Sequence, residues 1–485
     1  MSRAGQWCVG ASLLAALWGC GDDREPGDGV DETIDNVLGA RGGVLDVRRS
    51  LAVTDRDILS RFSLQRVMDT LARDAKVKGV SGLDLFKQWW DTQNPKQGLG
   101  QGAHCDDEID AAGRPLLNGY PYDCRPAPSE GVQASCTSFD DPGCAYLPIG
   151  LFNRFDLAPE DGSHCGEYRI IYAKQTGQTN RFDRNLVIFE AVLANPLPKQ
   201  GLAGCRRIVE AWAELSWIEA PGKRADRLEE IYFRGTGPFP AVVRIENLGH
   251  NERLLGQVRT NQFIVKAEPP LIWTLREFKL SRACDRKSCR AEFVPVTVKT
   301  NPIGALFGDP ASDAHAAEFQ AAFLKDNVAA LASNSLTDIS MRVDDRFNSG
   351  QSHSSGSPEM QFQTYFAAAP RDFRLALWRS LGTLGCDITP EQLIARARTQ
   401  TCAGCHQLSN NEDLGGGLIW PPSLGFVHVS EELPETVAGR VRYRISPLLT
   451  SSFLPTRARV MVDYLNDLPR RRRGWGWSVG GRTTH

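Results

Sequence analysis

Cys402, Cys405 and His406 are the residues of this 485-residue chain whose types and spacing define the most specific chemistry. Two thiols separated by two residues can reach both vinyl groups of one porphyrin and form thioethers, and the histidine that follows then lies under the iron as its proximal ligand. With 13 Cys and 8 His in the chain, such a run arises by chance in well under about 1% of similar sequences. The motif therefore predicts one covalently bound haem c.

Two other chemistries use a Cys-x-x-Cys pair. A structural zinc ion needs four ligands. No second Cys-x-x-Cys exists in the chain, so Cys402 and Cys405 would have to be joined by His428 and Cys386. A thioredoxin-type pair opens a helix after a strand, whereas this pair is expected to follow a helix. Haem c is favoured over both alternatives.

The elements around the motif are expected to be a helix, a loop and a closing helix. Thr389 is typical of an N-cap, with Pro390 at the first helical position and Gln392 completing a capping box, which predicts a helix over residues 391–398. Glycines and prolines predict an irregular loop over residues 415–422. Apolar residues at helical spacing predict the closing helix over residues 457–468.

This order of elements resembles a class I cytochrome c domain over about the last 85 residues. The resemblance implies an all-α haem domain. In that class a Met usually comes from a loop before the last helix, but the loop at residues 446–455 contains no Met. His428 is therefore the favoured distal ligand, Met461 the second candidate, and an open position the third possibility. His428 could also be a structural histidine. The candidate partners for haem propionates are Arg442, Arg444 and Arg457.

The first residues of the chain predict export. Arg3 is followed by a short apolar run that is too short to span a membrane. The sequence Leu-Trp-Gly-Cys ending at Cys20 resembles the lipobox of bacterial lipoproteins, which implies acylation of Cys20 and a membrane anchor. An ordinary signal peptide is the alternative. Both interpretations place the protein in the bacterial cell envelope, facing the periplasm or on the outer membrane, where haem c is attached.

Nine cysteines remain once Cys8, Cys20 and the two motif cysteines are set aside. So many thiols in an exported chain indicate disulfides. The expected local pairs are Cys136–Cys144 and Cys284–Cys289, with Cys105–Cys124 and Cys165–Cys205 as further candidates. Cys386 is the odd cysteine, or pairs elsewhere.

The middle of the chain predicts a mixed fold. Segments rich in β-branched and aromatic residues predict strands at 168–173, 186–193, 241–245, 262–266, 271–280 and 293–298. Helices are expected within 54–90 and at 206–215, 224–233, 313–331 and 372–381. The fold class is α+β multidomain, with a helical N-terminal segment, a disulfide-bearing β-rich or α+β middle domain and the all-α haem domain. Hydrophobic residues make up 41% of the chain and the net charge is −2, which gives no reason to expect a nucleic-acid partner.

The predicted organisation has seven parts. They are a lipoprotein signal peptide at 1–20, a flexible acidic tether at 21–43, a helical segment at 44–100, the disulfide-bearing α+β domain at 101–300, a helical connector at 301–385, the cytochrome c-like haem domain at 386–469 and a disordered tail at 470–485. His164, with Asp156, Glu160, Asp161 and Glu167 nearby, could form a metal or acid–base cluster. A disulfide-held turn with solvated carboxylates is the favoured interpretation.

Several segments of the body, FNRFDLAPEDGSHCGEY, GQVRTNQF, WTLREFKL and the later FVHV, resemble a group of uncharacterised bacterial envelope proteins with a C-terminal CxGCH. The resemblance implies one shared architecture but no assigned reaction. The expected function is one-electron transfer to an unknown redox partner by a lipid-anchored, mono-haem c-type cytochrome, an electron carrier rather than a catalyst. The alternatives are a haem enzyme or small-molecule sensor with an open distal site, and a binding or structural lipoprotein.

Overall fold

The computed structural model describes residues 45–96, 99, 102–125, 132–264, 272–286, 288–355 and 357–467. The predicted signal peptide, Cys20, the acidic tether and the tail at 470–485 lie outside these residues. Within them, every helix is too short or too polar to cross a membrane.

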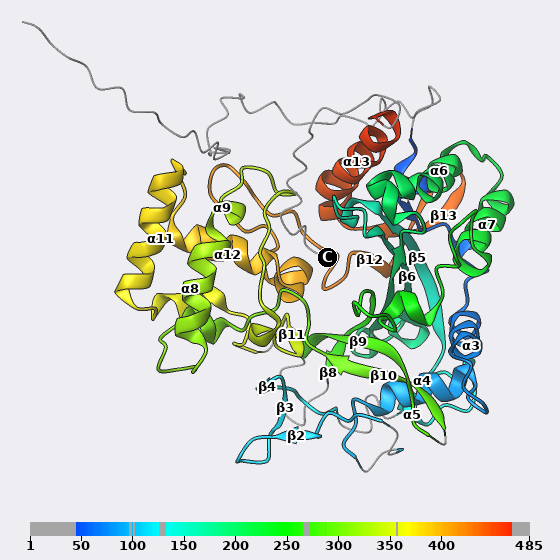
Figure 1. The fold of residues 1–485 in the computed structure, drawn as a ribbon, viewed down its shortest axis with the longest axis horizontal. Coiled ribbons are helices and arrows are strands. Elements are labelled where there is room, and N and C mark those ends of the chain that lie inside the picture. The colour runs from blue at the N-terminus through cyan, green and yellow to red at the C-terminus, as the bar shows by residue number, and fades with distance from the viewer. Residues whose placement is uncertain are drawn as a thin grey trace, which may run out of the picture.

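A large antiparallel sheet organises the first part of the molecule (Figure 1). Its strand order is β1-β5-β6-β7-β8-β9-β10, and β11 also pairs with β9. The strands are β1 Ala52–Val53, β5 Tyr146–Arg154, β6 His164–Lys174, β7 Asn185–Ala194, β8 Gln257–Ile264, β9 Ile272–Cys284, β10 Cys289–Val296 and β11 Gln351–His353. Five of the six predicted strands fall on β6 to β10, while β5 was not expected.

The strand expected at 241–245 is wrong. Those residues form a bend that leads into the 3₁₀ helix Ile245–Leu248. The backbone N–H groups of Val242 and Val243 donate to the carbonyls of Ile231 and Tyr232. The hydrogen bonds of this segment are therefore made with the preceding helical turn, so its β-branched residues enter no sheet.

Helices cover one face of the sheet with aromatic contacts. They are α3 Leu64–Ala75, α4 Gly82–Asp91, α6 Arg206–Glu214 and α7 Pro221–Glu229. Trp89 of α4 lies with its ring centroid 5.7 Å from that of Phe278 and 4.7 Å from that of Phe293. Trp212 of α6 stacks on Tyr168 at 5.9 Å. This layer and the sheet form the first hydrophobic core.

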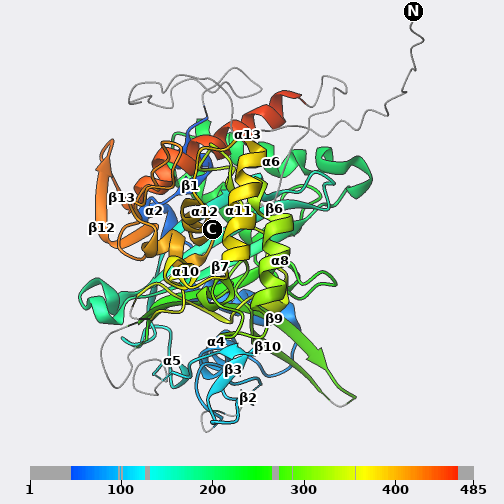
Figure 2. The ribbon, with the colours of Figure 1, turned by 90° about the vertical axis from the view of Figure 1, so that its left-hand side faces the viewer.

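A second group of helices has its own core and lies beside the sheet (Figures 1 and 2). It contains α8 Ala316–Asp326, α9 Val328–Leu331, α10 Phe362–Ala367, α11 Arg371–Leu384 and α12 Pro390–Thr399. Phe307 is central to the core, with ring centroids 4.9 Å from Phe319 and 4.5 Å from Phe362. The predicted helix at 313–331 is two helices, with a break at Asn327.

The C-terminal part of the chain joins both cores. α12 packs in the second core, whereas α13 Leu454–Asp467 packs in the first. Between them lies a hairpin of β12 Val429–Val437 and β13 Arg440–Ile445. The expectation that residues 386–469 are all-α is therefore wrong, because this stretch contains the hairpin. Ala438 and Gly439, both with positive φ, close the hairpin.

Disulfides close loops in the first part of the molecule. The four pairs are those named from the sequence, Cys105–Cys124, Cys136–Cys144, Cys165–Cys205 and Cys284–Cys289. Cys386 is disulfide-bonded as well, so it is not the unpaired cysteine. A small sheet of β2 Glu108–Ile109, β3 Pro115–Leu117 and β4 Tyr120–Pro121 lies next to the first of these bridges.

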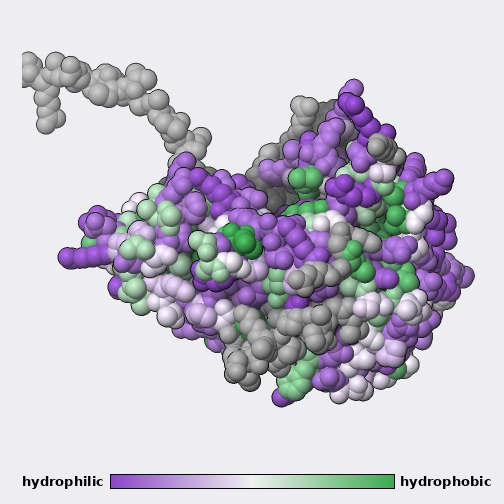
Figure 3. All heavy atoms as spheres, turned by 90° about the horizontal axis from the view of Figure 1, so that it is seen from below, coloured by the Kyte–Doolittle hydropathy of each residue, from purple (hydrophilic) through white to green (hydrophobic). Residues whose placement is uncertain are grey.

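The surface seen from below is mostly hydrophilic, with hydrophobic residues scattered over it (Figure 3). Scattered apolar residues of this kind are normal for a folded protein.

Candidate haem-binding site

The motif follows directly from the end of α12. The capping box is confirmed, since Thr389 Oγ1 accepts a hydrogen bond from the backbone N–H of Gln392 at 3.2 Å and the Gln392 side chain accepts one from that of Thr389 at 2.9 Å. After α12 the chain turns into a π-helical segment, Gly404–Leu408. A Cβ atom at Gly404 would collide with the Arg398 carbonyl. This explains why glycine precedes the second motif cysteine.

Two buried arginines hold the turn in place, and neither was predicted to lie at the site. Arg396 donates to the carbonyls of Leu414 at 2.7 Å and of Leu331 at 3.0 Å. Arg398 donates to the carbonyl of Leu408 at 3.0 Å and pairs with Glu412. These hydrogen bonds attach the loop after the motif to α12 and to the second core.

His406 is buried, and its Nδ1 lies 2.8 Å from the carbonyl oxygen of Phe426. Because a carbonyl only accepts, Nδ1 carries the proton and Nε2 keeps its lone pair. Burial lowers the pKa of His406 to about 4, so the ring is neutral at pH 7. The Asn261 amide also donates to the Phe426 carbonyl, at 3.2 Å. This is the arrangement of a metal-ligating histidine whose second nitrogen is held by the backbone.

Phe426 supplies that carbonyl from an unfavourable backbone conformation. Its φ is 72°, which is uncommon for a bulky residue and costs on the order of 1–3 kcal/mol. Aromatic contacts hold the residue, because its ring lies 5.2 Å from Trp273 and 5.4 Å from Phe263. Backbone strain of this kind gathers at functional sites, and here it directs the acceptor at His406.

The two motif thiols are free and buried. Burial raises the pKa of Cys402 to about 11 and raises that of Cys405 further. Redox-active Cys-x-x-Cys pairs need a lowered thiol pKa, so this environment disfavours thiol–disulfide exchange.

The zinc alternative also lacks its ligands. Cys386 is in a disulfide. Among the described residues, the one group of three or more His, Cys, Asp or Glu ligand atoms within 4.8 Å of one another is Cys105, Asp106 and Cys124. Two of those three residues form a disulfide.

The structure separates the two distal-ligand candidates. The His428 ring lies 4.4 Å from the His406 ring, its Nε2 is 3.4 Å from Cys405 Sγ, and its Nδ1 is 3.0 Å from Ser446 Oγ. Metal–imidazole bonds of about 2 Å place two opposed ligating nitrogens about 4 Å apart, so both histidines can bind one iron only if their rings separate. Met461 Sδ instead faces the Asn153 amide at 3.8 Å, within the first core.

The face of the sheet next to the motif carries buried ion pairs, which the sequence did not reveal. Arg259 pairs with Glu190 at 3.2 Å and with Glu277 at 3.0 Å. Arg169 pairs with Glu167 and, at 3.2 Å, with Glu190. Alternation along neighbouring strands brings these residues to one face. Asn261 on the same strand as Arg259 reaches His406, with its Nδ2 3.4 Å from Nδ1, which places the motif over this face.

The cluster suggested around His164 is not a metal group. His164 accepts a hydrogen bond from the Gly166 N–H at 3.2 Å and lies beside the Cys165–Cys205 bridge. Glu160 and Asp161 are exposed. Asp156 and Glu167, however, are buried and paired with arginines, so the expectation of solvated carboxylates is wrong for these two.

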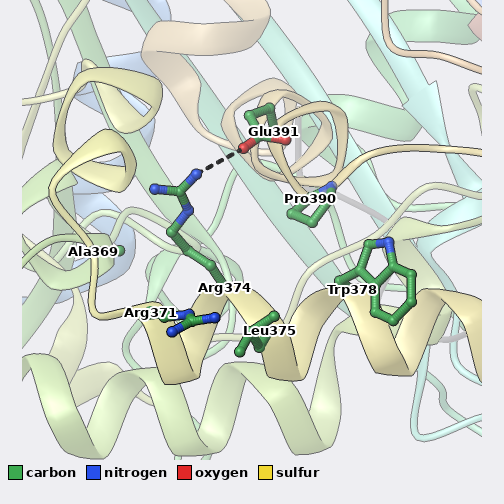
Figure 4. Close-up of a pocket in the computed structure, with 7 residues that line it drawn as sticks. All are labelled: Ala369, Arg371, Arg374, Leu375, Trp378, Pro390 and Glu391. Atoms are coloured by element: carbon green, nitrogen blue, oxygen red, sulfur yellow. Dashed lines mark ion pairs between the residues drawn. The ribbon is translucent and has the colours of Figure 1, made fainter.

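A surface pocket of about 450 Å³ lies between α11 and the start of α12 (Figure 4). Arg374 and Glu391 form an ion pair of 3.8 Å across it, and Trp378 borders it. None of the motif residues lines this pocket, so it is not the haem site.

No protein-family model, curated protein or solved structure matches this chain.

Proposed function

We propose that this protein is an exported, mono-haem c-type cytochrome that transfers single electrons in the cell envelope. The observation that carries the proposal is the hydrogen bond between His406 Nδ1 and the Phe426 carbonyl. It leaves Nε2 as the ligating nitrogen on the same helical turn as the two thiols. Burial of Cys402 and Cys405 supports thioethers shielded from water.

The residues present fit a haem. Cys402 and Cys405 would hold the porphyrin, and His406 would bind the iron. The side-chain oxygen of Asn261 and the Nε of Arg457 are buried without a hydrogen-bond partner among the described residues, which suits a site that takes up a polar cofactor. When bound, the haem supplies an iron that gains and loses one electron.

The chain's own residues would set the properties of the haem. Burial keeps His406 neutral. The Phe426 carbonyl, which also accepts from Asn261, orients the His406 ring, which favours a stable ligand bond. The buried surroundings keep solvent from the cofactor and so affect its reduction potential. The electron comes from and passes to another one-electron carrier of the envelope, whose identity the chain does not specify.

We propose that His428 would be the second histidine to bind the iron, since its imidazole already lies in the motif's immediate surroundings. Met461 faces Asn153 instead. The rings of His406 and His428 would have to separate around the iron. Because the Phe426 carbonyl holds His406, the His428 side chain is the part of the site that would move. A low reduction potential is expected for two histidine ligands relative to His/Met.

Haem content tests the proposal directly. The exported protein, produced in cells that also mature a control c-type cytochrome, is treated with acid–acetone and assayed as the pyridine haemochrome. Haem that stays with the chain, one per protein, is expected, and the Cys402→Ala, Cys405→Ala double variant should lose it. Haem-free protein from cells that mature the control would refute the cytochrome assignment.

Carbon monoxide distinguishes an electron carrier from a haem enzyme or sensor. The reduced wild type should not bind it, because His406 and His428 would both bind the iron. His428→Ala should bind it, while Met461→Leu should leave the spectrum unchanged. Carbon monoxide binding by the wild type would instead support the open-site alternative.

The compartment and the anchor belong to the same proposal. The disulfides in the structure suit an oxidising, exported location. Acylation of Cys20 would attach the protein to the membrane through lipid chains. Metabolic labelling with a radioactive fatty acid should mark the wild type and not Cys20→Ser, whereas an unlabelled wild type would favour an ordinary signal peptide.

A further inference from the structure

A buried ion pair lies next to the loop that carries Phe426 and His428. Arg184, which directly precedes β7, donates to both carboxylate oxygens of Glu431 in β12, with Nε 2.6 Å from Oε1 and Nη2 3.2 Å from Oε2. Arg184 is 7% exposed and Glu431 is 1% exposed. A two-point contact of this kind fixes the relative orientation of the two side chains as well as their distance.

The same guanidinium also reaches the other end of the loop, because its Nη1 donates to the carbonyl of Gly425 at 3.1 Å. One side chain from the main sheet therefore holds both ends of the segment 425–431. The backbone of Glu431 is held as well, since its carbonyl accepts a hydrogen bond from Gln178 Nε2 at 3.0 Å. These contacts attach the segment to the loop that leads into β7.

The residues between these two ends carry the groups that a haem would need. The Phe426 carbonyl accepts the hydrogen bond from His406, and the His428 ring lies 4.4 Å from the His406 ring. Trp273 connects the ion pair with Phe426, because Arg184 lies over its ring at 5.6 Å and Phe426 stacks on it at 5.2 Å. Direct contacts therefore lead from Arg184 to the segment that presents both histidines with their surroundings.

The chemistry of this contact indicates positioning rather than stability. A buried ion pair contributes little net stability compared with apolar side chains of similar volume, and in some proteins it serves to select one arrangement of the chain. The segment needs such selection, because Phe426, with a φ of 72°, takes a backbone conformation that a bulky residue does not favour by itself.

From these contacts we infer that Arg184 is a positioning residue for both histidines. With Glu431 it fixes the segment 425–431. His406 then keeps its orientation, and His428 stays close enough to bind the same iron. The inference rests on the proposed haem and on His428 as its second histidine ligand.

The test measures stability and carbon monoxide binding in the same haem-loaded variants. Arg184→Leu leaves Glu431 buried without its ion-pair partner among the described residues, so the melting temperature should fall by several degrees. The double variant Arg184→Leu, Glu431→Leu removes both charges and should recover most of that loss. Both variants should bind carbon monoxide in the reduced form, because His428 would no longer be held within reach of the iron.

The double variant separates positioning from stability. A recovered melting temperature together with carbon monoxide binding is the expected result. Recovered stability without carbon monoxide binding would overturn the inference, because the segment would then keep its place without Arg184. Arg184→Lys keeps the charge but cannot contact Glu431 at two points and Gly425 as well. It should bind carbon monoxide too, and it provides the same decision if the leucine variants do not fold.

Arg442→Leu is the matched control. Arg442 lies on β13 of the same hairpin and bonds Asp55 at 3.1 Å, and both residues are buried. Its loss should lower the melting temperature and leave the reduced protein unable to bind carbon monoxide. Carbon monoxide binding by this variant would show that any damage to the hairpin opens the site, and it would overturn the assignment to Arg184.

Hydrogen exchange gives a second reading, which follows the backbone of the segment directly and does not depend on the haem. In the double variant the amides of residues 424–431 should exchange at least about tenfold faster than in the wild type, as expected from losing a hydrogen bond to a charged donor. Arg442→Leu should leave them unchanged. Equal exchange in the double variant and the wild type would contradict the inference.

These outcomes keep the inference distinct from the proposed function. A haem-free wild type would refute the proposed function itself. Carbon monoxide binding by the haem-loaded wild type would remove His428 as a ligand and overturn the inference with it. A haem-loaded wild type that does not bind carbon monoxide, with a double variant that behaves in the same way, would refute the role of Arg184 alone.

Discussion

The two faces of the main sheet are both buried, yet they are built from opposite chemistry. On the face covered by α4 and α6, residues such as Phe189, Val258 and Phe278 contact tryptophans and other apolar side chains. On the face toward the Cys-x-x-Cys-His turn, Glu190, Arg259 and Glu277 form ion pairs. Val258 and Arg259 are neighbours on β8 and point to opposite faces.

This difference indicates which face has a function beyond folding. A buried apolar face stabilises the fold by excluding water, at about 25 cal/mol per Å². A buried ion-pair network contributes little net stability compared with apolar packing of similar volume. Buried charges with shifted pKa values gather at functional sites, and here they lie beside the motif that would hold a cofactor.

One substitution on each face of β8 tests this comparison. Arg259→Leu removes the buried guanidinium that pairs with both Glu190 and Glu277 and should reduce the free energy of unfolding by about 3–5 kcal/mol. Val258→Ala removes two buried carbon atoms and should reduce the free energy of unfolding by about 2 kcal/mol. Chemical denaturation of the haem-loaded variants measures both. If Arg259→Leu costs no more than Val258→Ala, the polar face is hydrated and not a closed network.

The pH dependence of stability tests whether the charged face of the sheet is closed to water. Burial lowers the pKa of Lys279, at the edge of the polar face, from 10.5 to about 8. The unfolded chain therefore binds more protons between pH 8 and 10.5, so the contribution of this group to stability increases as the pH rises through that window. The free energy of unfolding of the wild type, relative to that of Lys279→Met, should increase by about 2 kcal/mol between pH 8 and 10.

Denaturation at several pH values, with the two proteins compared at each, isolates this contribution. Lys199 is exposed, and Lys199→Met provides the control in which the difference from wild type stays constant. A constant difference for Lys279→Met as well would show that Lys279 is solvated in the folded state.

The smallest expected effect is at the N-cap of α12, which lies outside both faces of the sheet. Thr389→Ala removes the N-cap of α12 and should cost about 1 kcal/mol, while Thr389→Ser should keep most of the stability. Thermal unfolding checks both variants. A loss of stability as large as that expected for Arg259→Leu would mean that the start of α12 is coupled to the charged face. It would contradict the expectation that the capping box acts locally.

The parts of the site that could be predicted are local in sequence. The Cys-x-x-Cys-His spacing and the capping box at Thr389 involve residues within a few positions of each other, so their geometry follows from one turn of chain. The four disulfides were also named in advance, with sequence separations of 5 to 40 residues. Five strands and most helices followed from their hydrophobic periodicity.

The parts that could not be predicted depend on contacts between distant segments. The carbonyl of Phe426 reaches His406 because Trp273 and Phe263 hold a residue with a positive φ. The hairpin at 429–445 lies in a region expected to be all-α, and its pairing brings together residues on either side of a turn at Ala438 and Gly439. The missed strand β5 contains Pro148 and Gly150, where the register shifts, and such residues normally argue against a strand.

The sequence by itself determined the chemistry that the motif can perform, because thiol spacing and the adjacent histidine are set by covalent distance along one turn. It also determined the local elements, through caps and periodicity. Only the tertiary structure decided that the motif is buried, which nitrogen of His406 is available, and that the motif lies over the charged face of the sheet. These features arise when residues far apart in the chain pack together, such as Asn261 and His406, which are 145 positions apart, and no local pattern in the chain encodes that proximity.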